Sequence, residues 1–205
     1  RGGPSTGLPT KTEQSDLLQV LYGRNGESPM PVIAPTSPTG CFESAYQACK
    51  IALEYMTPVV LLSDGYIANG SGAWMLPTDE DMPSIVPHRV TSEMKYQYSP
   101  YLRDNETKVR YWAIPGEEGF EHIIGGLEKD SDTGEISNTP DNHNMMVRNR
   151  AEKVAGIKVP DLTVSGDVDH AGLLIVGFGG TYGHLYSALE ELLNRGKKVA
   201  LAHFE

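Results

Sequence analysis

Two strand–helix–strand patterns restrict the fold of this chain more than any other feature of its sequence. Largely apolar runs at 30–34 and 58–63 flank a helical stretch in the first half of the chain, and similar runs at 173–177 and 198–204 flank another near the C-terminus. Apolar strands joined by helices are typical of parallel sheets covered on both faces. The sequence therefore predicts an α/β protein, with one pair of parallel strands in each of two separate sheets.

The first of these helices carries residues that favour its two ends. Ser37 is expected to be the N-cap and Pro38 the first helical residue. Seven apolar residues then repeat at helical spacing and form one face, namely Phe42, Ala45, Tyr46, Cys49, Ala52, Leu53 and Met56. Pro58 is expected to end the helix. Further helices are predicted at about 16–21 and 141–155.

The middle of the chain breaks every periodic pattern. Residues 64–120 contain prolines that interrupt helices and central strands, at positions 77, 83, 87, 100 and 115. We therefore expect a long irregular segment there. Residues 1–130 are predicted to form one domain, 131–169 a helix and a linker, and 170–205 the first βαβ unit of a second domain. A lone βαβ unit leaves a sheet edge open, so the chain is expected to be a fragment.

Composition argues against several classes of partner. The 205 residues carry a net charge of −10, which repels phosphate backbones and anionic lipid, so nucleic acid and membrane are poor partners. Hydrophobic residues make up 39%, enough to bury a core. No apolar run approaches the roughly 20 residues of a membrane helix, and no secretory leader is visible. We therefore expect a soluble, cytoplasmic enzyme that acts on a small molecule.

The two cysteines and six histidines predict no metal site in this chain. Cys41 and Cys49 fall in one predicted helix, about 12 Å apart along its axis, which is too far for a disulfide. Two cysteines cannot supply the usual four thiolates of an iron–sulfur cluster. The histidines show no zinc spacing. Buried, reduced thiols are the expected state of both cysteines.

A glycine turn between the last two predicted strands resembles a dinucleotide-binding loop only in part. Gly177, Gly179 and Gly183 follow an apolar run and precede a helix, but Tyr182 stands where the third glycine of that fingerprint belongs. Glu205 lies near the place of the acidic residue that would bind a ribose. Glycines are also required wherever a strand turns tightly into a packed helix, and we favour this structural interpretation.

Residues 1–16 are the densest candidate for binding. Three glycines allow a ligand to approach the backbone closely, and hydroxyl groups come from Ser5, Thr6, Thr10 and Thr12. Arg1 offers the planar fork that grips a carboxylate at two oxygens. From the residues alone, a ligand-binding loop and an ordinary terminal loop both remain open.

The N-terminal residues resemble a signature stretch in the alpha subunits of 2-oxoacid:ferredoxin oxidoreductases, above all those of the 2-oxoglutarate type. The stretch reads Arg1-Gly-Gly-Pro-Ser-Thr-Gly-Leu-Pro-Thr-Lys-Thr-Glu-Gln-Ser-Asp-Leu-Leu-Gln. Further segments similar to the family follow in the same order, namely Tyr22-Gly-Arg-Asn-Gly-Glu, Pro58-Val-Val-Leu-Leu-Ser-Asp-Gly-Tyr-Ile-Ala-Asn-Gly, Pro100-Tyr-Leu-Arg-Asp, Gly126-Leu-Glu-Lys and Lys153-Val-Ala-Gly-Ile. The resemblance covers essentially the whole chain.

This resemblance implies a thiamine diphosphate enzyme that oxidatively decarboxylates a 2-oxoacid, forms an acyl-CoA and reduces ferredoxin. It implies the C-terminal part of the pyrimidine domain of a thiamine-diphosphate-binding fold, followed by the start of a transketolase C-terminal-like Rossmann-type domain. The diphosphate with Mg and a 4Fe-4S cluster are expected on a beta partner subunit, and a gamma segment is a possible addition. The chain lacks the GDG motif for the diphosphate, in agreement with that division.

The resemblance also assigns roles to the N-terminal loop. Arg1 matches the family arginine that holds the carboxylate of the 2-oxoacid, with Ser5, Thr6 and Lys11 as its neighbours in the loop. The family's pyrimidine-contacting Glu and substrate-contacting Thr lie upstream of Arg1, so no catalytic residue is expected in this chain, and the chain alone is expected to be inactive. Two alternatives stay open: a non-catalytic scaffold module of a thiamine-fold complex, and the pyrimidine domain of a transketolase-like enzyme.

Overall fold

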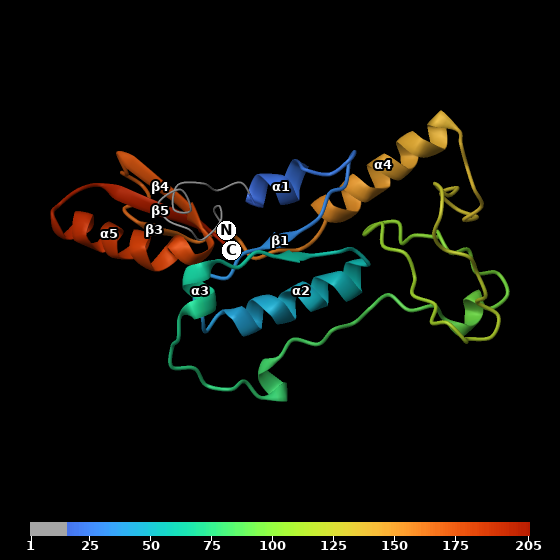
Figure 1. The fold of residues 1–205 in the computed structure, drawn as a ribbon, viewed down its shortest axis with the longest axis horizontal. Coiled ribbons are helices and arrows are strands. Elements are labelled where there is room, and N and C mark those ends of the chain that lie inside the picture. The colour runs from blue at the N-terminus through green and yellow to red at the C-terminus, as the bar shows by residue number, and fades with distance from the viewer. Residues whose placement is uncertain (1–15) are drawn as a thin grey trace.

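Two separate sheets organise residues 16–205, the part of the chain that the computed structural model describes (Figure 1). The first sheet pairs β1 (Val32–Ile33) with β2 (Val60–Leu61) in parallel. The second has the order β3-β5-β4, formed by β3 (Val164–Gly166), β4 (Leu173–Phe178) and β5 (Val199–Phe204). β4 and β5 are parallel, whereas β3 is antiparallel to β5. The predicted α/β class and the division of the predicted strands between two sheets are confirmed.

The helix between β1 and β2 begins later than the sequence predicts. Helix α2 spans Cys41–Tyr55, and Gly40 occupies its N-cap position. Ser37 does not cap it. Instead, the Ser37 hydroxyl accepts a hydrogen bond from the backbone N–H of Gly40 at 3.0 Å, which closes a separate turn before the helix. Met56 ends the helix in the left-handed conformation, with φ of 46°.

The predicted irregular segment at 64–120 is confirmed, and it continues to residue 139. It contains the short helix α3 (Gly65–Asn69) and two 3₁₀ turns, at Asp79–Asp81 and Ser92–Met94. Three side chains on one face of α2, spaced four residues apart, hold this segment along the helix. Tyr46 Oη donates to Pro83 O at 2.7 Å, Lys50 Nζ donates to Ser84 O, and Glu54 Oε1 accepts from Val86 N at 2.8 Å. Figure 1 shows the segment running beside α2 and then folding into loops at one end of the molecule.

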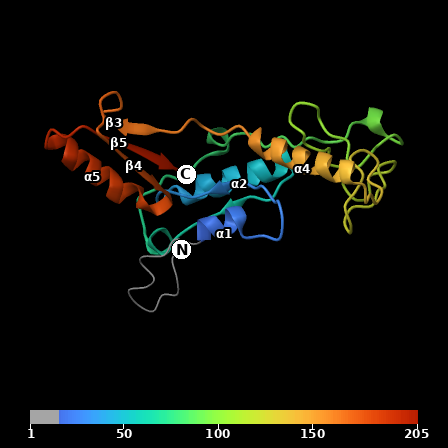
Figure 2. The same ribbon diagram turned by 90° about the horizontal axis from the view of Figure 1, so that it is seen from above.

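Two more helices complete the first half of the fold. Helix α1 covers Asp16–Tyr22, and helix α4 covers Pro140–Ala155, close to the predicted 141–155. Pro140 stands in the first turn of α4, where its missing N–H costs nothing. An ion pair between Glu27 and Arg150 ties the segment after α1 to α4. Seen from above, α4 extends from the sheets toward the loops of the irregular segment (Figure 2).

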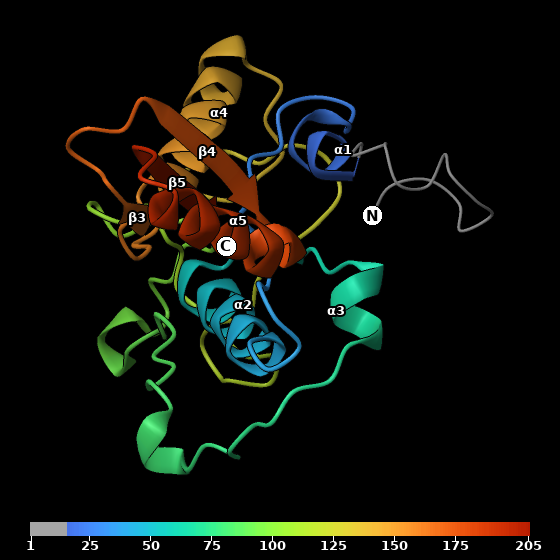
Figure 3. The same cartoon turned by 90° about the vertical axis from the view of Figure 1, so that its left-hand side faces the viewer.

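The second sheet has its own small core. Helix α5 (Tyr182–Asn194) packs on the sheet through Leu189, which lies against Val199 and Leu201 of the central strand β5. The end-on view shows α5 crossing one face of these strands (Figure 3). Side chains alternate along a strand, and Ile175 faces α5, so the exposed side chains of Leu174 and Val176 lie on the opposite face of β4.

Strand β3 lies in a segment that the sequence predicts as linker. Val164 pairs with Ala202 and Gly166 with Ala200, so β3 covers one edge of β5. Gly166 has φ of 99° and lies close to the Val199 carbonyl, which leaves no room for a side chain. Strand β3 has only three residues, two of them exposed, so its sequence has too little apolar pattern to predict a strand. The domain boundaries stay a prediction.

The glycine turn after β4 contacts residues that follow the two strands of the first sheet. Gly179, with φ of 57°, lies against Ala34, and Gly180 lies against the carboxylate of Asp64. This close approach supports the structural interpretation of the glycines. None of the helices within residues 16–205 combines the length and the apolar character that crossing a bilayer requires.

Candidate functional site

The binding residues that the sequence predicts, Arg1, Ser5, Thr6 and Lys11, lie outside the described residues. Their roles therefore stay predictions. Within residues 16–205, the candidate site is a cavity of about 300 Å³ between helix α4 and the loops of the irregular segment. We call it the basic pocket. Its lining comprises Tyr101, Arg103, Arg110, Gly126, Leu127, Glu128, Lys129, Met146, Arg150 and Lys153.

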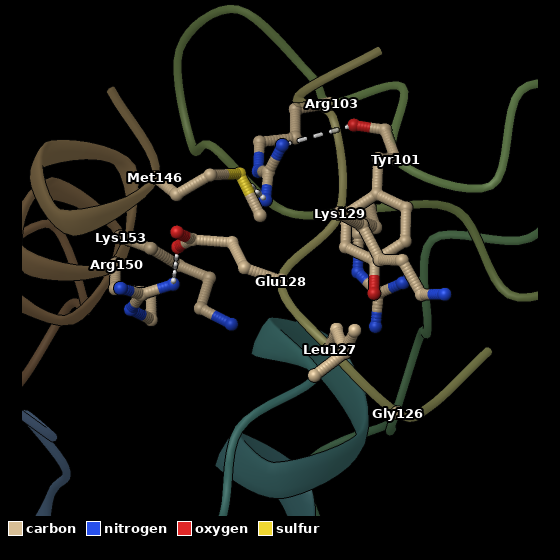
Figure 4. Close-up of a pocket in the computed structure, with 10 residues that line it drawn as sticks. Tyr101, Arg103, Gly126, Leu127, Glu128, Lys129, Met146, Arg150 and Lys153 are labelled. Carbon is tan, nitrogen blue, oxygen red and sulfur yellow. Dashed lines mark hydrogen bonds and ion pairs between the residues drawn. The ribbon is translucent and has the colours of Figure 1, made fainter. Parts of the chain in front are cut away.

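Helix α4 supplies one wall of the basic pocket. Met146, Arg150 and Lys153 recur at intervals of four and three residues, so they share one helix face. Figure 4 shows Arg150 and Lys153 reaching from the helix toward the segments that carry Arg103 and Glu128. A smaller adjoining cavity of about 20 Å³ is lined by Lys108 and by several of the same basic side chains.

Two turns of the same design supply the opposite wall. Asp104 Oδ1 accepts hydrogen bonds from Thr107 N at 2.7 Å and Thr107 Oγ1 at 2.8 Å. Asp130 Oδ1 accepts from Thr133 N at 2.9 Å and Thr133 Oγ1 at 3.1 Å. Each aspartate follows a basic residue of the pocket, Arg103 in the first turn and Lys129 in the second. The turns therefore place two cations at equivalent positions of two neighbouring loops.

The first turn also brings two arginines face to face. Arg103 and Arg110 are partners in an antiparallel β-bridge. Arg103 Nη1 donates to Tyr101 O at 3.0 Å and to Ser131 O at 3.1 Å, and Arg110 Nη1 donates to Pro100 O at 3.2 Å. The Arg110 guanidinium also lies 4.6 Å from the centroid of the Tyr101 ring. These contacts orient both guanidinium groups without neutralising either.

The basic pocket holds more positive than negative charge. Its one carboxylate, Glu128, lies 2.7 Å from Nδ1 of His143 and 3.8 Å from Nη1 of Arg150. Among residues 16–205, Arg103, Arg110, Lys129 and Lys153 make no ion pair. Lys129 is buried, with 7% of its surface exposed, and the other three are half-buried.

Burial and neighbouring positive charges lower the pKa of two of these cations. Burial, followed by the charges of Arg110, Arg103 and Arg150, lowers the pKa of Lys153 to about 8. Burial and then Arg110 lower the pKa of Arg103 to about 10, so its guanidinium still stays charged at neutral pH. Lys153 therefore changes its charge at a lower pH than Arg103 does.

The basic pocket does not fit a thiamine diphosphate held through a divalent metal. Such a metal needs several oxygen ligands, and the pocket offers one carboxylate that is already engaged by Arg150 and His143. Within residues 16–205, no group of three or more His, Cys, Asp or Glu side chains could hold a metal ion. The predicted burial of both thiols is wrong, because Cys41 is half-buried and Cys49 is exposed, on the same helix. The chemistry that the pocket supports is the binding of an anion.

Sequence reasoning did not identify this pocket. Three segments that resemble the family, 100–104, 126–129 and 153–157, converge on it, although none was assigned a role. The repeated pattern of a basic residue followed by Asp-x-x-Thr, at Arg103 and at Lys129, is the signal that could have indicated it.

Comparison with known proteins identifies relatives of the whole chain. Residues 1–139 match the family described as pyruvate flavodoxin/ferredoxin oxidoreductase, thiamine diphosphate-binding. The 2-oxoglutarate oxidoreductase subunit KorA of Mycobacterium tuberculosis is 54% identical over 99% of this chain and 31% of that protein. Subunit alpha of the 2-oxoacid:ferredoxin oxidoreductase 2 of Aeropyrum pernix is 32% identical over 98% of this chain and 32% of that protein.

A solved structure shares the same fold. It is the 2-oxoglutarate:ferredoxin oxidoreductase from Magnetococcus marinus with 2-oxoglutarate, coenzyme A and succinyl-CoA bound, and it matches with a TM-score of 0.86 and 31% identity. The match covers 99% of this chain and 35% of that chain. This chain thus spans about a third of the length of these relatives.

Proposed function

The chain belongs to the pyruvate flavodoxin/ferredoxin oxidoreductase family, in its thiamine diphosphate-binding domain, and we propose that it is part of the alpha subunit of a 2-oxoglutarate:ferredoxin oxidoreductase. The observation that carries this proposal is similarity along the entire chain. Both the 54% identity to a 2-oxoglutarate oxidoreductase subunit and the TM-score of 0.86 to a 2-oxoglutarate:ferredoxin oxidoreductase extend over 99% of its residues. These relatives favour the oxidoreductase over the scaffold and transketolase-like alternatives.

The proposed reaction couples decarboxylation to electron transfer. 2-Oxoglutarate, coenzyme A and two oxidised ferredoxins give succinyl-CoA, carbon dioxide, one proton and two reduced ferredoxins. When bound, thiamine diphosphate supplies the carbanion chemistry that makes the decarboxylation possible. The relatives are named as subunits, which implies a complex of several subunits.

The other parts of the reaction belong to partners in this proposal. A beta subunit holds the diphosphate with Mg and a 4Fe-4S cluster, and a gamma segment completes some complexes of this kind. The complex works in the cytoplasm, where its thiols stay reduced.

The proposed role of this chain at the substrate rests on its N-terminal loop. Arg1 holds one carboxylate of the 2-oxoacid with both nitrogens of its fork, and Ser5, Thr6 and Lys11 line the same loop. A bidentate, charge-assisted contact fixes the orientation of the substrate as well as its affinity. This proposal is carried by the resemblance of residues 1–19 to the family signature.

The test is an assay of the complete complex. The full-length subunit is co-expressed without oxygen with its beta subunit, and viologen or ferredoxin reduction is followed. We expect turnover that requires both 2-oxoglutarate and coenzyme A and yields succinyl-CoA. Pyruvate serves as the competing substrate and should react with a kcat/KM lower by about tenfold or more.

Two outcomes would contradict the proposal. A complex that prefers pyruvate would exclude the 2-oxoglutarate type while leaving the family intact. A correctly assembled complex, loaded with thiamine diphosphate and cluster, that reduces no acceptor with any 2-oxoacid would favour the scaffold alternative.

A further inference from the structure

The basic pocket contains more positive charge than its own residues can neutralise. Four of its cations make no ion pair within residues 16–205, namely Arg103, Arg110, Lys129 and Lys153. The fifth, Arg150, is paired with Glu27 and lies near Glu128. The net charge of the chain is −10, so this concentration of cations is not part of a generally basic surface.

A purely structural role does not account for the arrangement. Arg103 and Arg110 face each other across a β-bridge, and like charges at directly opposite positions destabilise a strand pair. Partial burial makes each charge more costly, as the lowered pKa of Lys153 reflects. Neutral side chains would fill the same space at a lower cost. A bound anion would lower this cost, because its negative charge attracts the cations that line the pocket.

The shape and the donors of the pocket fit a phosphate group. The cavity of about 300 Å³ exceeds the size of a phosphate and is open to solvent, so it can hold the charged end of a larger molecule. One guanidinium group can bind two phosphate oxygens through two parallel N–H groups. Arg103 and Arg110 are already oriented by backbone carbonyl groups and the Tyr101 ring. Lys129, only 7% exposed, adds an ammonium group that is held in place by its buried stem.

We propose that the basic pocket binds the phosphate group of a small phosphorylated ligand. The phosphate can come from coenzyme A or from another phosphorylated metabolite. The first source rests on the proposed function, since coenzyme A is a substrate of that reaction. The phosphate site itself does not, because it follows from the charges and geometry of the pocket.

Binding is measured on the purified complex without turnover, so the result does not depend on activity. Isothermal titration calorimetry with inorganic pyrophosphate tests the wild type, Arg110→Gln and Lys129→Met. The matched control is Arg148→Gln, an exposed arginine on the same helix α4 that does not line the pocket. We expect Arg110→Gln and Lys129→Met to weaken binding by about tenfold or more, and Arg148→Gln by less than about twofold.

Further measurements distinguish loss of the binding site from loss of folding and from nonspecific binding of anions. Arg110→Lys keeps the charge but loses the fork, and it should bind with an affinity between those of the wild type and Arg110→Gln. Circular dichroism and subunit association should be unchanged in the variants that are compared. Succinate, a dicarboxylate, should bind at least about tenfold more weakly than pyrophosphate at equal ionic strength.

Kinetics then identify the source of the phosphate. If it is the 3′-phosphate of coenzyme A, Arg110→Gln should raise the KM for coenzyme A without changing the KM for 2-oxoglutarate. With dephospho-coenzyme A, the wild type and the variant should then behave alike. An unchanged KM for coenzyme A combined with lost pyrophosphate binding supports the phosphate site and assigns it to another metabolite.

Other results would overturn the proposal. Absence of pyrophosphate binding by the wild type at millimolar concentration would do so, as would equal binding by Arg110→Gln or equal binding of succinate. If pyrophosphate fails to bind and the pocket variants lose subunit association instead, the cations serve to dock acidic residues of a partner subunit.

Discussion

The ammonium group of Lys153 donates a hydrogen bond to the carbonyl oxygen of Met56 at 2.8 Å. Met56 is the residue that ends helix α2, so the bond places a positive charge at the negative end of that helix. It also links α4 to α2 across 97 residues of sequence. The same ammonium group lines the basic pocket beside Arg103, Arg110 and Arg150, whose charges oppose its protonation.

This position predicts how stability depends on pH. The pKa of Lys153 is about 8 in the folded protein against 10.5 for an ordinary lysine. Between these values the folded protein has released the proton and the unfolded chain still holds it, so the free energy of unfolding rises with pH. Lys153→Met lacks this titration. In the full-length subunit, the difference in unfolding free energy between wild type and variant should grow by about 1 kcal/mol from about pH 8 to about pH 10.

Thermal or denaturant unfolding at several pH values checks this expectation. Lys158→Met replaces an exposed lysine just after α4 and should show no comparable change with pH. A wild-type advantage that stays constant with pH would mean that Lys153 is not held in a perturbed state.

Anion binding should also depend on pH, in the opposite sense. The charged and titratable groups that line the pocket with Lys153 are Tyr101, Arg103, Arg110, Glu128, Lys129 and Arg150. The pKa of Lys153 is about 8, so this cation loses its charge and binding should weaken as the pH rises through that value. Sulfate is a suitable probe because its own charge stays constant in this range. We expect its Kd to increase about threefold or more from about pH 7 to about pH 9. Calorimetric titration of Lys153→Arg should give a nearly constant Kd, and a wild-type Kd that is equally constant would exclude Lys153 from the site.

The turn at Asp104 should support both stability and the pocket. Its carboxylate accepts hydrogen bonds from Glu106 N, Thr107 N and Thr107 Oγ1, and these bonds lower its pKa. Asp104→Ala removes all three acceptor contacts and should cost about 1–2 kcal/mol of unfolding free energy. It should also weaken sulfate binding, because the turn positions Arg103 and Arg110. Asp104→Asn keeps one acceptor oxygen and should be affected less in both thermal unfolding and titration. Wild-type sulfate affinity in Asp104→Ala would show that the pocket does not depend on the turn.

The contact between Gly180 and Asp64 predicts that a side chain at position 180 destabilises the fold. A Cβ at residue 180 would overlap the Asp64 carboxylate, which caps helix α3 by accepting from Ile67 N at 2.9 Å. Moving the carboxylate breaks this cap, so Gly180→Ala should cost about 1–3 kcal/mol. Gly183→Ala, in the first turn of α5 with open space around it, should instead be neutral or slightly stabilising. In an Asp64→Ser background, where the shorter side chain still caps the helix, Gly180→Ala should cost less. Equal costs in both backgrounds, measured by denaturant unfolding, would contradict the proposed overlap.

Sequence reasoning was most successful where the determining contacts are close in the chain. Leu185 and Leu189 repeat at helical spacing and pack with Val199 and Leu201 of the next strand, so the pattern already contains the core of the second sheet. Such local agreement between period and packing is the strongest sequence signal. The predicted start of α2 was wrong because Ser37 accepts a hydrogen bond from the Gly40 N–H in a separate turn. A preference for serine at the N-cap does not distinguish such a turn from the start of a helix.

The basic pocket could not be predicted in the same way. Arg103, Lys129 and Lys153 come from three segments separated by more than twenty residues each, and only the fold brings them together. A single basic residue before an aspartate turn is usually a solvated side chain. Such a residue indicates a binding site only when the fold places further cations beside it, as a second turn and one face of α4 do here.

The last prediction concerns Arg1, which lies outside the described residues. If its fork holds the carboxylate of the 2-oxoacid, Arg1→Lys retains the charge but loses the paired geometry. In the complete alpha–beta complex, kcat/KM for 2-oxoglutarate should fall by about tenfold or more, which corresponds to about 1.4 kcal/mol of transition-state stabilisation. The KM for coenzyme A should barely move, because the proposed contact of Arg1 is with the 2-oxoacid and not with coenzyme A. Lys11→Met should have the smaller effect, since Lys11 is a neighbour of Arg1 in the family signature and not the proposed anchor. Wild-type kcat/KM in Arg1→Lys would exclude the bidentate contact and leave the loop a structural role.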